Sequence, residues 1–445
     1  MKVLIIGFGI SGKSACKLLK KLGYTISIVE DDRKINNSDI DRLLCGLSFV
    51  VVSPGVKPDS PIVKRAKELG INVVGELELG CAHLSGKLVA VTGTNGKTTT
   101  TSLIGKLLEG NNTFVGGNIG TPISSFADRT NNDSITVAEV SSFQLAETTS
   151  FRPNIAAFLN FAPDHLNYHK TTQNYLNSKL KIFKNQTQSD FAVLNADDKV
   201  VSKIKLPTSK VYYFSTKKQV NGCFVRGDGI YFRDTTKCVP GYLKAKRVAS
   251  VSDVKLVGEH NLSNAVCAVC CAMLAGRKPE VIREKLSSFK PVAHRLQTVS
   301  TFGGITFIND SKATNPASAV CAIKSMTRPT ILILGGSDKG LKFDDIFKIK
   351  NSYVKFYVFI GETKKLLASC ATKHGITNYC CADTLKEAII SSIRHASSGD
   401  VVLLSPACAS FDMFSGYEER GKCFCGIVRE LKRNENNFHN SHEKT

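Results

Sequence analysis

The stretch VTGTNGKTTTT at residues 91–101 decides how the middle of the chain folds. An apolar run typical of a buried strand precedes it, and apolar residues at helical spacing follow it, among them Leu103, Ile104 and Leu107. The stretch is a shorter variant of the phosphate-binding pattern G-x-x-x-x-G-K-[ST], because Val91 stands where the first glycine of the full pattern would be. It therefore predicts a strand, a glycine turn and a helix that bind a nucleoside triphosphate; the alternative is a glycine turn without a ligand.

Each residue type in this loop suits phosphate chemistry. Gly93 and Gly96 allow the backbone to curl so that N–H groups face phosphate oxygens, and Lys97 brings a positive charge to them. Thr98 offers a hydroxyl ligand to Mg²⁺. Threonine is a poor helix former, so the run of it at residues 98–101 indicates that hydroxyl groups are needed there.

Candidate metal and substrate residues lie on three further segments. Glu139 stands in the apolar run SITVAEVSSFQL (134–145), which predicts either a metal ligand or a salt-bridged structural residue, since a buried carboxylate needs a partner. His165 follows the strand-like run IAAFLN and is either a ligand or an ordinary loop histidine. The segment GGNIGTP (116–122) predicts a polar loop that closes over a substrate, or a simple turn.

Lys179 is set apart from its neighbours by its position on a predicted helix, NYLNSKLKIFK. At 100° per residue it lies on the same face as Tyr175, in the middle of the apolar side. Lys181 and Lys184 point away from that side. A lysine so placed either extends its charge to solvent or loses the charge through burial. A neutral amine can take up CO₂ as a carbamate, an anionic oxygen ligand for Mg²⁺, and both outcomes stay open at this point.

The first residues of the chain, MKVLIIGFGISGKS, carry a second glycine loop. Gly7, Gly9 and Gly12 form G-x-G-x-x-G after an apolar strand, and a further strand ends in Glu30, where a carboxylate would bind the ribose of NAD. The same loop also suits the pyrophosphate of a UDP group. A nicotinamide-dependent dehydrogenase would explain only residues 1–30 and would leave the second phosphate loop without a use.

Strand, glycine turn and helix units recur along the chain and predict an α/β protein of three domains. We expect a Rossmann-like domain at residues 1–85, a central mononucleotide-binding domain with a mostly parallel sheet at 86–291, and a Rossmann-like α/β domain at 292–445, with a hinge near Pro291. In the last domain three strands end in the polar loops NDSKATN, GGSDKG and SPACAS, which should line one side of a site.

Composition excludes several classes of protein. The net charge is +21, but the basic residues form no cluster and no aromatic-interleaved stretch, so a surface that attracts nucleotides is favoured over nucleic-acid binding. No apolar run reaches membrane-spanning length and no signal segment opens the chain, so a soluble cytoplasmic protein is expected. The 15 cysteines lack the paired spacing of a zinc site, and those at 267, 270 and 271 predict reduced thiols in a helix core.

Taken together, these motifs resemble the ATP-dependent Mur ligases of bacterial cell-wall synthesis. The resemblance rests on GTNGKTTT, the strand-borne Glu139, DHL at 164–166, the helix of Lys179, HNLSN at 260–264 and HR at 294–295. Within the family, GFGISGKS, NDSKATN and SPACAS resemble the members that add D-glutamate rather than those that add L-alanine. Two departures are Asn167, where the family commonly has Asp, and Tyr417, where a Phe is familiar.

The resemblance implies roles for individual residues. The UDP-binding positions are Ile10, Ser11, Asp32, Arg33, Ser53 and Gly55. The ATP-binding positions are Gly93, Thr94, Asn95, Gly96, Lys97, Thr98, Thr99, Asn261, Asn264, Arg295 and Asp310. The metal ligands are Thr98, Glu139, His165 and carbamylated Lys179. Asn118 and His165 would face the muramoyl-alanine end, and Lys312 the transferring phosphate. The positions that match D-glutamate contacts are Thr314, Lys339, Ser410 and Tyr417.

The implied reaction joins D-glutamate to UDP-N-acetylmuramoyl-L-alanine at the expense of ATP, with Mg²⁺, expected as two ions. Lys97, Lys179, His165 and Lys312 are then the expected catalytic residues. We expect these small molecules to be the partners of a monomeric protein that binds no nucleic acid and has no membrane span.

Overall fold

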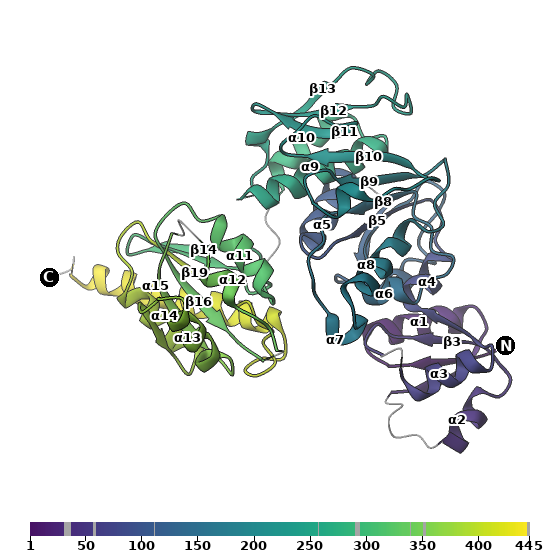
Figure 1. The fold of residues 1–445 in the computed structure, drawn as a ribbon, viewed down its shortest axis with the longest axis horizontal. Helices are drawn as coiled ribbons and strands as arrows, with labels where there is room; N and C mark the ends of the chain where they lie inside the picture. Colours follow the sequence, from purple (N-terminus) through teal and green to yellow (C-terminus); the bar gives the residue numbers. More distant parts are fainter. Residues whose placement is uncertain are drawn as a thin grey trace. The chain divides into compact units, whose positions relative to one another are not determined.

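The chain folds as an α/β protein, and the strands of its described residues form three sheets of four, nine and six strands (Figure 1). A computed structural model describes residues 1–30, 37–56, 59–110, 112–256, 258–289, 294–338, 340–349 and 353–442. By their internal contacts the residues fall into two compact units, Met1–Lys255 with Leu262–Phe289 and Leu256–Asn261 with Lys290–Thr445. The hinge predicted near Pro291 lies outside the described residues. None of the described helices combines the length and the apolar character that crossing a membrane requires.

The first sheet is fully parallel, in the strand order β2-β1-β3-β4. Its strands are rich in Val and Ile, which suit a sheet covered by helices on both faces. The strands are β1 (Lys2–Ile6), β2 (Thr25–Val29), β3 (Leu47–Val52) and β4 (Asn72–Gly75). The helices are α1 (Ile10–Lys21), α2 (Asn37–Leu44), α3 (Pro61–Glu68) and α4 (Glu76–Cys81).

The second sheet has the order β13-β12-β11-β10-β9-β8-β5-β7-β6, parallel from β6 to β11 and antiparallel beyond. The strands are β5 (Lys87–Thr92), β6 (Thr113–Gly117), β7 (Ile135–Glu139), β8 (Ile155–Phe158), β9 (Phe191–Asn195), β10 (Lys210–Ser215), β11 (Gly222–Arg226), β12 (Gly229–Arg233) and β13 (Lys246–Ser250). The helices are α5 (Lys97–Leu107), α6 (Ser142–Ala146), α7 (Leu166–His169), α8 (Thr172–Leu180), α9 (Glu259–Leu274) and α10 (Pro279–Ser288), with 3₁₀ turns η2 (Ile123–Ser125), η3 (Lys181–Phe183), η4 (Val201–Lys203) and η5 (Val251–Asp253). Because β5 lies between β7 and β8, the loop after β5 meets the carboxyl ends of both neighbours.

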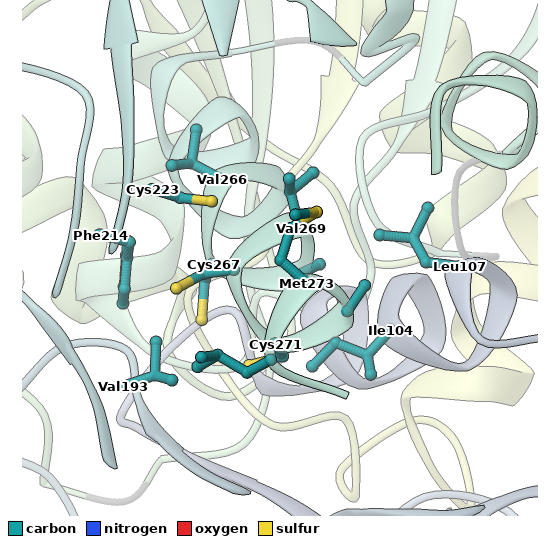
Figure 2. Packing of buried hydrophobic residues seen from close by; sticks show 14 of the residues in the cluster. Ile104, Leu107, Val193, Phe214, Cys223, Val266, Cys267, Val269, Cys271 and Met273 are labelled. Atoms are coloured by element: carbon teal, nitrogen blue, oxygen red, sulfur yellow. The ribbon is translucent and has the colours of Figure 1, made fainter. Parts of the chain in front are cut away.

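Helix α9 supplies the centre of the largest apolar core, against α5 and the strands β9 to β11. Figure 2 shows Cys267 and Cys271 of α9 among apolar side chains such as Val193 and Phe214. Both thiols are fully buried, and burial raises the pKa of the Cys267 thiol. All 15 cysteines, every one within the described residues, are free. The cysteines of α9 thus act as apolar core residues, as the sequence predicts.

The third sheet has the order β14-β15-β19-β16-β17-β18 and is parallel except for the β14–β15 pair. The strands are β14 (Gln297–Phe302), β15 (Ile305–Asn309), β16 (Thr330–Gly335), β17 (Val354–Ile360), β18 (Tyr379–Cys381) and β19 (Val401–Leu404). The helices are α11 (Pro316–Lys324), α12 (Asp344–Phe347), α13 (Lys364–Lys373), α14 (Leu385–Arg394) and α15 (Tyr417–His442). Strand β19 lies between β15 and β16, so the three polar loops that follow these strands emerge side by side at their carboxyl ends.

Candidate active site

Residues 93–96 connect β5 to α5 and form the loop predicted to bind phosphate. Gly96 is the N-cap of α5 with φ of 83°, and Gly93 has φ of 155°, so both glycines use their conformational freedom. A Cβ atom at Gly96 would lie 2.4 Å from Oδ1 of Asn264, so the side chain of Asn264 packs against the loop. The first N–H groups of an α-helix have no intrahelical acceptor, which makes this end of α5 suited to an anion.

Asn160, at the end of the run that follows β8, braces the loop through three hydrogen bonds. Its Oδ1 accepts from the N–H of Asn95 at 2.8 Å, and its Nδ2 donates to the carbonyl of Asn95 at 3.0 Å. Its carbonyl accepts from the N–H of Thr94 at 3.0 Å. Two of the N–H groups predicted to face phosphate are therefore used within the protein. The N–H groups at the start of α5 are the better donors to a ligand.

Two lysines converge on one carbonyl of this loop. The Nζ atom of Lys97 donates to the carbonyls of Gly93 at 2.9 Å and Thr94 at 2.8 Å. The Nζ atom of Lys179 donates to the same carbonyl of Gly93 at 2.8 Å and lies 4.7 Å from the ring centroid of Tyr175. Lys179 is 1% exposed, so of the two outcomes that its place on the helix leaves open, the structure has the buried one. Burial, followed by the charge of Lys97, holds the pKa of Lys179 well below its usual value.

Glu139 is the last residue of β7 and is 2% exposed. Its Oε1 accepts a hydrogen bond from Nδ2 of Asn118 at 2.8 Å, and Asn118 also donates its N–H to the carbonyl of Glu139 at 2.8 Å. Among the described residues, no group donates to the buried Oε2 of Glu139. A buried carboxylate oxygen without a donor fits a bound cation, and oxygen ligands of this type suit Mg²⁺.

The threonines in the first turn of α5 are also buried. Thr98 is 5% exposed in the first turn, where the sequence predicts a metal ligand. The hydroxyl of Thr99 is buried and has no partner among the described residues. Hydroxyl oxygens and a carboxylate are donor types that suit Mg²⁺ rather than a metal that prefers sulfur or nitrogen.

His165 is less enclosed than the other predicted ligands. It is the N-cap of α7, with φ of 54°, and its side chain is 44% exposed. Its Nε2 lies 3.7 Å from Oδ2 of Asp164, and its ring is 6.1 Å from that of Tyr175. Tyr175 also contacts Lys179 and lies 3.4 Å, OH to Oγ1, from Thr94. The tyrosine thus joins His165, Lys179 and the phosphate loop, a role that the sequence did not reveal.

The N-terminal glycine loop closes against the end of β3. The Oγ of Ser53 donates to the carbonyl of Gly7 at 2.7 Å, and a Cβ atom at Gly12 would lie 2.1 Å from that same carbonyl oxygen. Of the predicted UDP-binding residues nearby, Ile10 is 74% exposed, Ser11 is half-buried and Gly55 is exposed. Asp32 and Arg33 lie outside the described residues.

A small pocket lies between the end of β3 and helix α6. On one side it is lined by Ser53 and Pro54, and on the other by Phe143, Gln144 and Tyr168. The ring of Phe143 lies 4.8 Å from that of His165. Ser53, a predicted UDP position, and Phe143, a neighbour of His165, therefore line the same small pocket within one compact unit.

Asp310, predicted near the ribose and phosphates, is buried at the end of β15. Its Oδ1 accepts from the N–H of Leu296 at 3.1 Å, and its Oδ2 accepts from Oγ of Ser405 at 2.8 Å. Burial raises the pKa of the Asp310 carboxyl to about 6, against the lowering effect of Arg295. The Nε atom of Arg295 is itself buried and without a partner among the described residues.

The predicted phosphate and D-glutamate contacts of the second unit lie on neighbouring loops. Lys312 has its Nζ 5.1 Å from the ring centroid of Tyr417, and the N–H of Thr314 donates to its carbonyl at 2.9 Å. Ser311, between β15 and Lys312, donates its hydroxyl to the carbonyl of Tyr417 at 2.9 Å. Ser410, after β19, is 2% exposed. Lys339 lies outside the described residues.

A family model described as the Mur ligase middle domain matches residues 91–272, and one described as the Mur ligase glutamate ligase domain matches residues 294–408. A UDP-N-acetylmuramoylalanine–D-glutamate ligase of Lachnoclostridium phytofermentans is 39% identical over 97% of this chain and 98% of the relative. A relative of the same description from Clostridioides difficile is 40% identical over 97% of this chain and 99% of its own length.

The chain belongs to the Mur ligase family. Solved structures agree on the fold. The UDP-N-acetylmuramate-alanine ligase of Thermotoga maritima aligns with a TM-score of 0.61 at 18% identity, over 97% of this chain and 100% of that one. A MurF ligase of the same organism, in complex with ADP, aligns with a TM-score of 0.60 at 15% identity, over 92% of this chain and 98% of that one. These likenesses confirm the three-domain α/β architecture of a Mur ligase.

The site residues of this Mur ligase fall in two groups, one in each compact unit. The first unit brings together the phosphate loop, Glu139, Lys179, Asn118 and Asn264. The second unit holds the loops of Asp310, Lys312, Thr314 and Ser410 and also Asn261, which is buried and donates its N–H to the carbonyl of Gly258 at 3.0 Å. The individual roles that the family resemblance gives to these residues stay predictions.

Proposed function

We propose that this Mur ligase joins D-glutamate to UDP-N-acetylmuramoyl-L-alanine and converts ATP to ADP and phosphate, as a step in peptidoglycan precursor synthesis. The names of the relatives at about 40% identity support this choice of substrates. One observation supports the proposed use of ATP and a metal ion most strongly. The buried Oε2 of Glu139 accepts no hydrogen bond from the described residues, and Lys97 and Lys179 both donate to one carbonyl of the phosphate loop.

The reaction must overcome repulsion between two anions. A carboxylate oxygen of the UDP-linked substrate attacks the γ-phosphorus of ATP, the bond to the bridging oxygen breaks, and ADP leaves, so that an acyl phosphate remains. Lys97 and the N–H groups at the start of α5 supply positive charge to the phosphate oxygens. Mg²⁺, when bound by Thr98, Glu139, His165 and carbamylated Lys179, would neutralise further phosphate charge.

Amide formation completes the reaction. The neutral amine of D-glutamate attacks the acyl carbon, gives up a proton, and inorganic phosphate leaves. Thr314, Lys339, Ser410 and Tyr417 hold the two carboxylates of D-glutamate and so fix the orientation of its amine. Lys312 lies close to the transferred phosphate.

Lys179 acts as a carbamate in this proposal. Its neutral amine adds to CO₂, a nitrogen–carbon bond forms, and one proton is released. The burial that holds down the pKa of Lys179 favours this step, because only the uncharged amine is nucleophilic. The product is anionic and suits a cation near Glu139, whereas an ammonium group at that position would repel one.

In this proposal the larger substrate, the UDP-linked one, binds to the first unit. Ile10, Ser11, Asp32, Arg33, Ser53 and Gly55 take the UDP group. The muramoyl-alanine end then lies near Asn118 and His165, and Phe143, whose ring contacts that of His165, lines a small pocket together with Ser53. ATP and a nucleotide-linked substrate are supplied inside the cell, so the proposed place of action is the cytoplasm, and the reaction as written needs only one chain.

Phosphate release tests the function directly. The protein is incubated with ATP, Mg²⁺ and UDP-N-acetylmuramoyl-L-alanine, and D-glutamate, L-glutamate, L-alanine or meso-diaminopimelate is added in parallel. Stimulation by D-glutamate alone is the expected result. Stimulation by L-alanine or meso-diaminopimelate instead would assign the chain to another branch of the family. Salt-sensitive DNA binding without phosphate release would rule out a ligase.

A further inference from the structure

Arg420, on the first turn of α15, is the largest fully buried side chain of the molecule among the described residues and is 1% exposed. Its Nε donates to the hydroxyl of Ser311 at 3.0 Å, and one Nη donates to the carbonyl of Ser311 at 2.9 Å. The guanidinium also donates to the carbonyls of Cys408 at 3.0 Å and Ala409 at 3.2 Å. One side chain therefore ties the loop after β15 to the loop after β19.

The loop after β16 joins the same arrangement. The carbonyl of Ala409 also accepts from the N–H of Ser337 at 2.9 Å. Gly336 has φ of 151°, and a Cβ atom there would lie 2.1 Å from the carbonyl oxygen of Ala409 and 3.1 Å from a guanidinium nitrogen of Arg420. All three strand-end loops thus pack around one guanidinium group.

No carboxylate forms an ion pair with Arg420 in the described part of the chain. Asp412 is the nearby acidic side chain, but its carboxylate accepts from the hydroxyl of Ser337 at 3.2 Å and from the N–H of Glu362 at 3.0 Å. Burial lowers the pKa of Arg420 to about 10, which leaves it charged at neutral pH. The guanidinium therefore carries a charge that no described carboxylate contacts directly, although Asp412 lies near enough to favour the charged form.

The residues predicted to contact phosphate and D-glutamate are direct neighbours of these anchor points. Lys312 follows Ser311, and Ser410 follows Ala409. The hydroxyl of Ser311 also donates to the carbonyl of Tyr417. A shift of the guanidinium would therefore move the loops of Lys312 and Ser410 together.

We propose that Arg420 is a positioning residue for the acceptor amino acid: it fixes the loops that carry Lys312, Thr314 and Ser410, and its charge, which no described carboxylate contacts directly, selects an amino acid with two carboxylates. This inference rests on the proposed function and assigns a residue that acts through others. A buried apolar side chain of similar size would hold the core together at lower desolvation cost, but it would provide neither the fork of donors nor the charge.

Three variants of the full-length protein separate these roles. Arg420→Met removes the fork and the charge, Arg420→Lys keeps the charge without the fork, and Arg429→Met changes an exposed arginine on the same helix as the matched control. Phosphate release gives KM for D-glutamate, for ATP and for the UDP-linked substrate. D-glutamine, which lacks the second carboxylate, reports on charge selection. Thermal melts report on folding.

The proposal gives each variant a distinct result. In Arg420→Met, KM for D-glutamate rises about tenfold or more, and the preference for D-glutamate over D-glutamine falls about tenfold, while the other two KM values change less than about twofold. In Arg420→Lys, KM for D-glutamate rises but the preference stays within about threefold of that of the unmodified protein. Arg429→Met behaves as the unmodified protein.

Other outcomes would overturn the proposal. An equal rise of all three KM values in Arg420→Met would indicate a general structural role. If that variant does not fold, Arg420→Lys is the deciding variant. An unchanged KM for D-glutamate would contradict the positioning of the loops by Arg420, and a lost preference for D-glutamate over D-glutamine would contradict selection by its charge. If the unmodified protein uses another amino acid, the proposed function fails, and the variants are then measured with that amino acid and its neutral analogue.

Discussion

Replacing Lys179 by methionine separates its chemistry from its part in folding. The lysine is 1% exposed and donates to the carbonyl of Gly93, which also accepts from Lys97. Lys179→Met therefore leaves that carbonyl with a donor. The methionine side chain is flexible and apolar and fills a similar space.

The expected change in stability follows from two opposed terms. The variant loses one hydrogen bond to a charged group, worth about 1.5–3 kcal/mol. It also removes the cost of burying this amine next to Lys97, which consists of desolvating the cation or of removing its proton and amounts to several kcal/mol. We expect the free energy of unfolding of the ligand-free protein to stay the same or to rise by about 1–2 kcal/mol.

The expected change in activity is large. Without an amine no carbamate forms, so the proposed Mg²⁺ site loses an anionic ligand. Less positive charge then reaches the phosphate oxygens, and the rate of phosphate release falls about 100-fold or more. An ordinary lysine with a pKa near 10.5 is about 0.3% neutral at about pH 8, and a lowered pKa raises that fraction. Carbamate formation is therefore feasible at Lys179 but unfavourable at an exposed lysine.

Three measurements check this prediction together. Urea unfolding gives stability, phosphate release gives activity, and carbon-13 NMR after equilibration with labelled CO₂ gives a carbamate signal in the unmodified protein that Lys179→Met lacks. Lys184→Met, at an exposed position just beyond the same helix, serves as the control and should match the unmodified protein. Activity of Lys179→Met within about threefold of normal, or a loss of stability above about 2 kcal/mol, would refute the reasoning.

Three further predictions follow from the contacts of other buried groups. Above about pH 7, the free energy of unfolding of Asp310→Asn should exceed that of the unmodified protein by up to about 3 kcal/mol. The reason is that the folded pKa of Asp310 is raised to about 6, so the unmodified protein loses stability as the pH rises through that value. Urea unfolding should show the difference vanish below about pH 4. Asn118→Ala removes the donor to Oε1 of Glu139, so a Mg²⁺ titration of phosphate release should show the required Mg²⁺ concentration rise about 10-fold to 100-fold. Glu78→Ala removes the acceptor of the N–H groups of residues 149–151, and urea unfolding should show a loss of about 3 kcal/mol or more.

Each of these three has an outcome that contradicts it. A difference for Asp310→Asn that does not vary with pH would show that its carboxyl titrates normally. An unchanged Mg²⁺ requirement in Asn118→Ala would separate Asn118 from the cation site. For Glu78→Ala, the exposed Glu68→Ala is the control, and equal stability of the two variants would mean that the Glu78 contacts contribute nothing.

Local pattern was enough to predict the parts of the site that depend on one segment. The glycine loop before α5, Glu139 at the end of β7 and the place of Lys179 on the apolar face of its helix follow from composition and periodicity alone, whereas the burial of the Lys179 amine does not. The family resemblance then indicated residues on loops with no periodicity of their own, such as Lys312 and Ser410.

Residues that act across the fold could not be predicted in this way. Asn160 braces the phosphate loop because β8 pairs with β5, and that pairing is not visible in either strand's sequence. Arg420 stands in the polar stretch YEERGK, where an arginine usually faces solvent, and only the packing of three loops around it reveals its burial. Tyr175 has the spacing of a core residue, and its contacts with Lys179 and His165 depend on the approach of α8 to the phosphate loop.

Transfer of an isotopic label tests most directly whether a carboxylate is activated by phosphate from ATP. UDP-N-acetylmuramoyl-L-alanine labelled with oxygen-18 in its free carboxylate is converted in the presence of ATP, Mg²⁺ and D-glutamate, and the released phosphate is analysed by mass spectrometry. An acyl phosphate leaves one labelled oxygen in each phosphate formed. Phosphate without the label would show that water, not the substrate, attacks ATP, and would contradict the account.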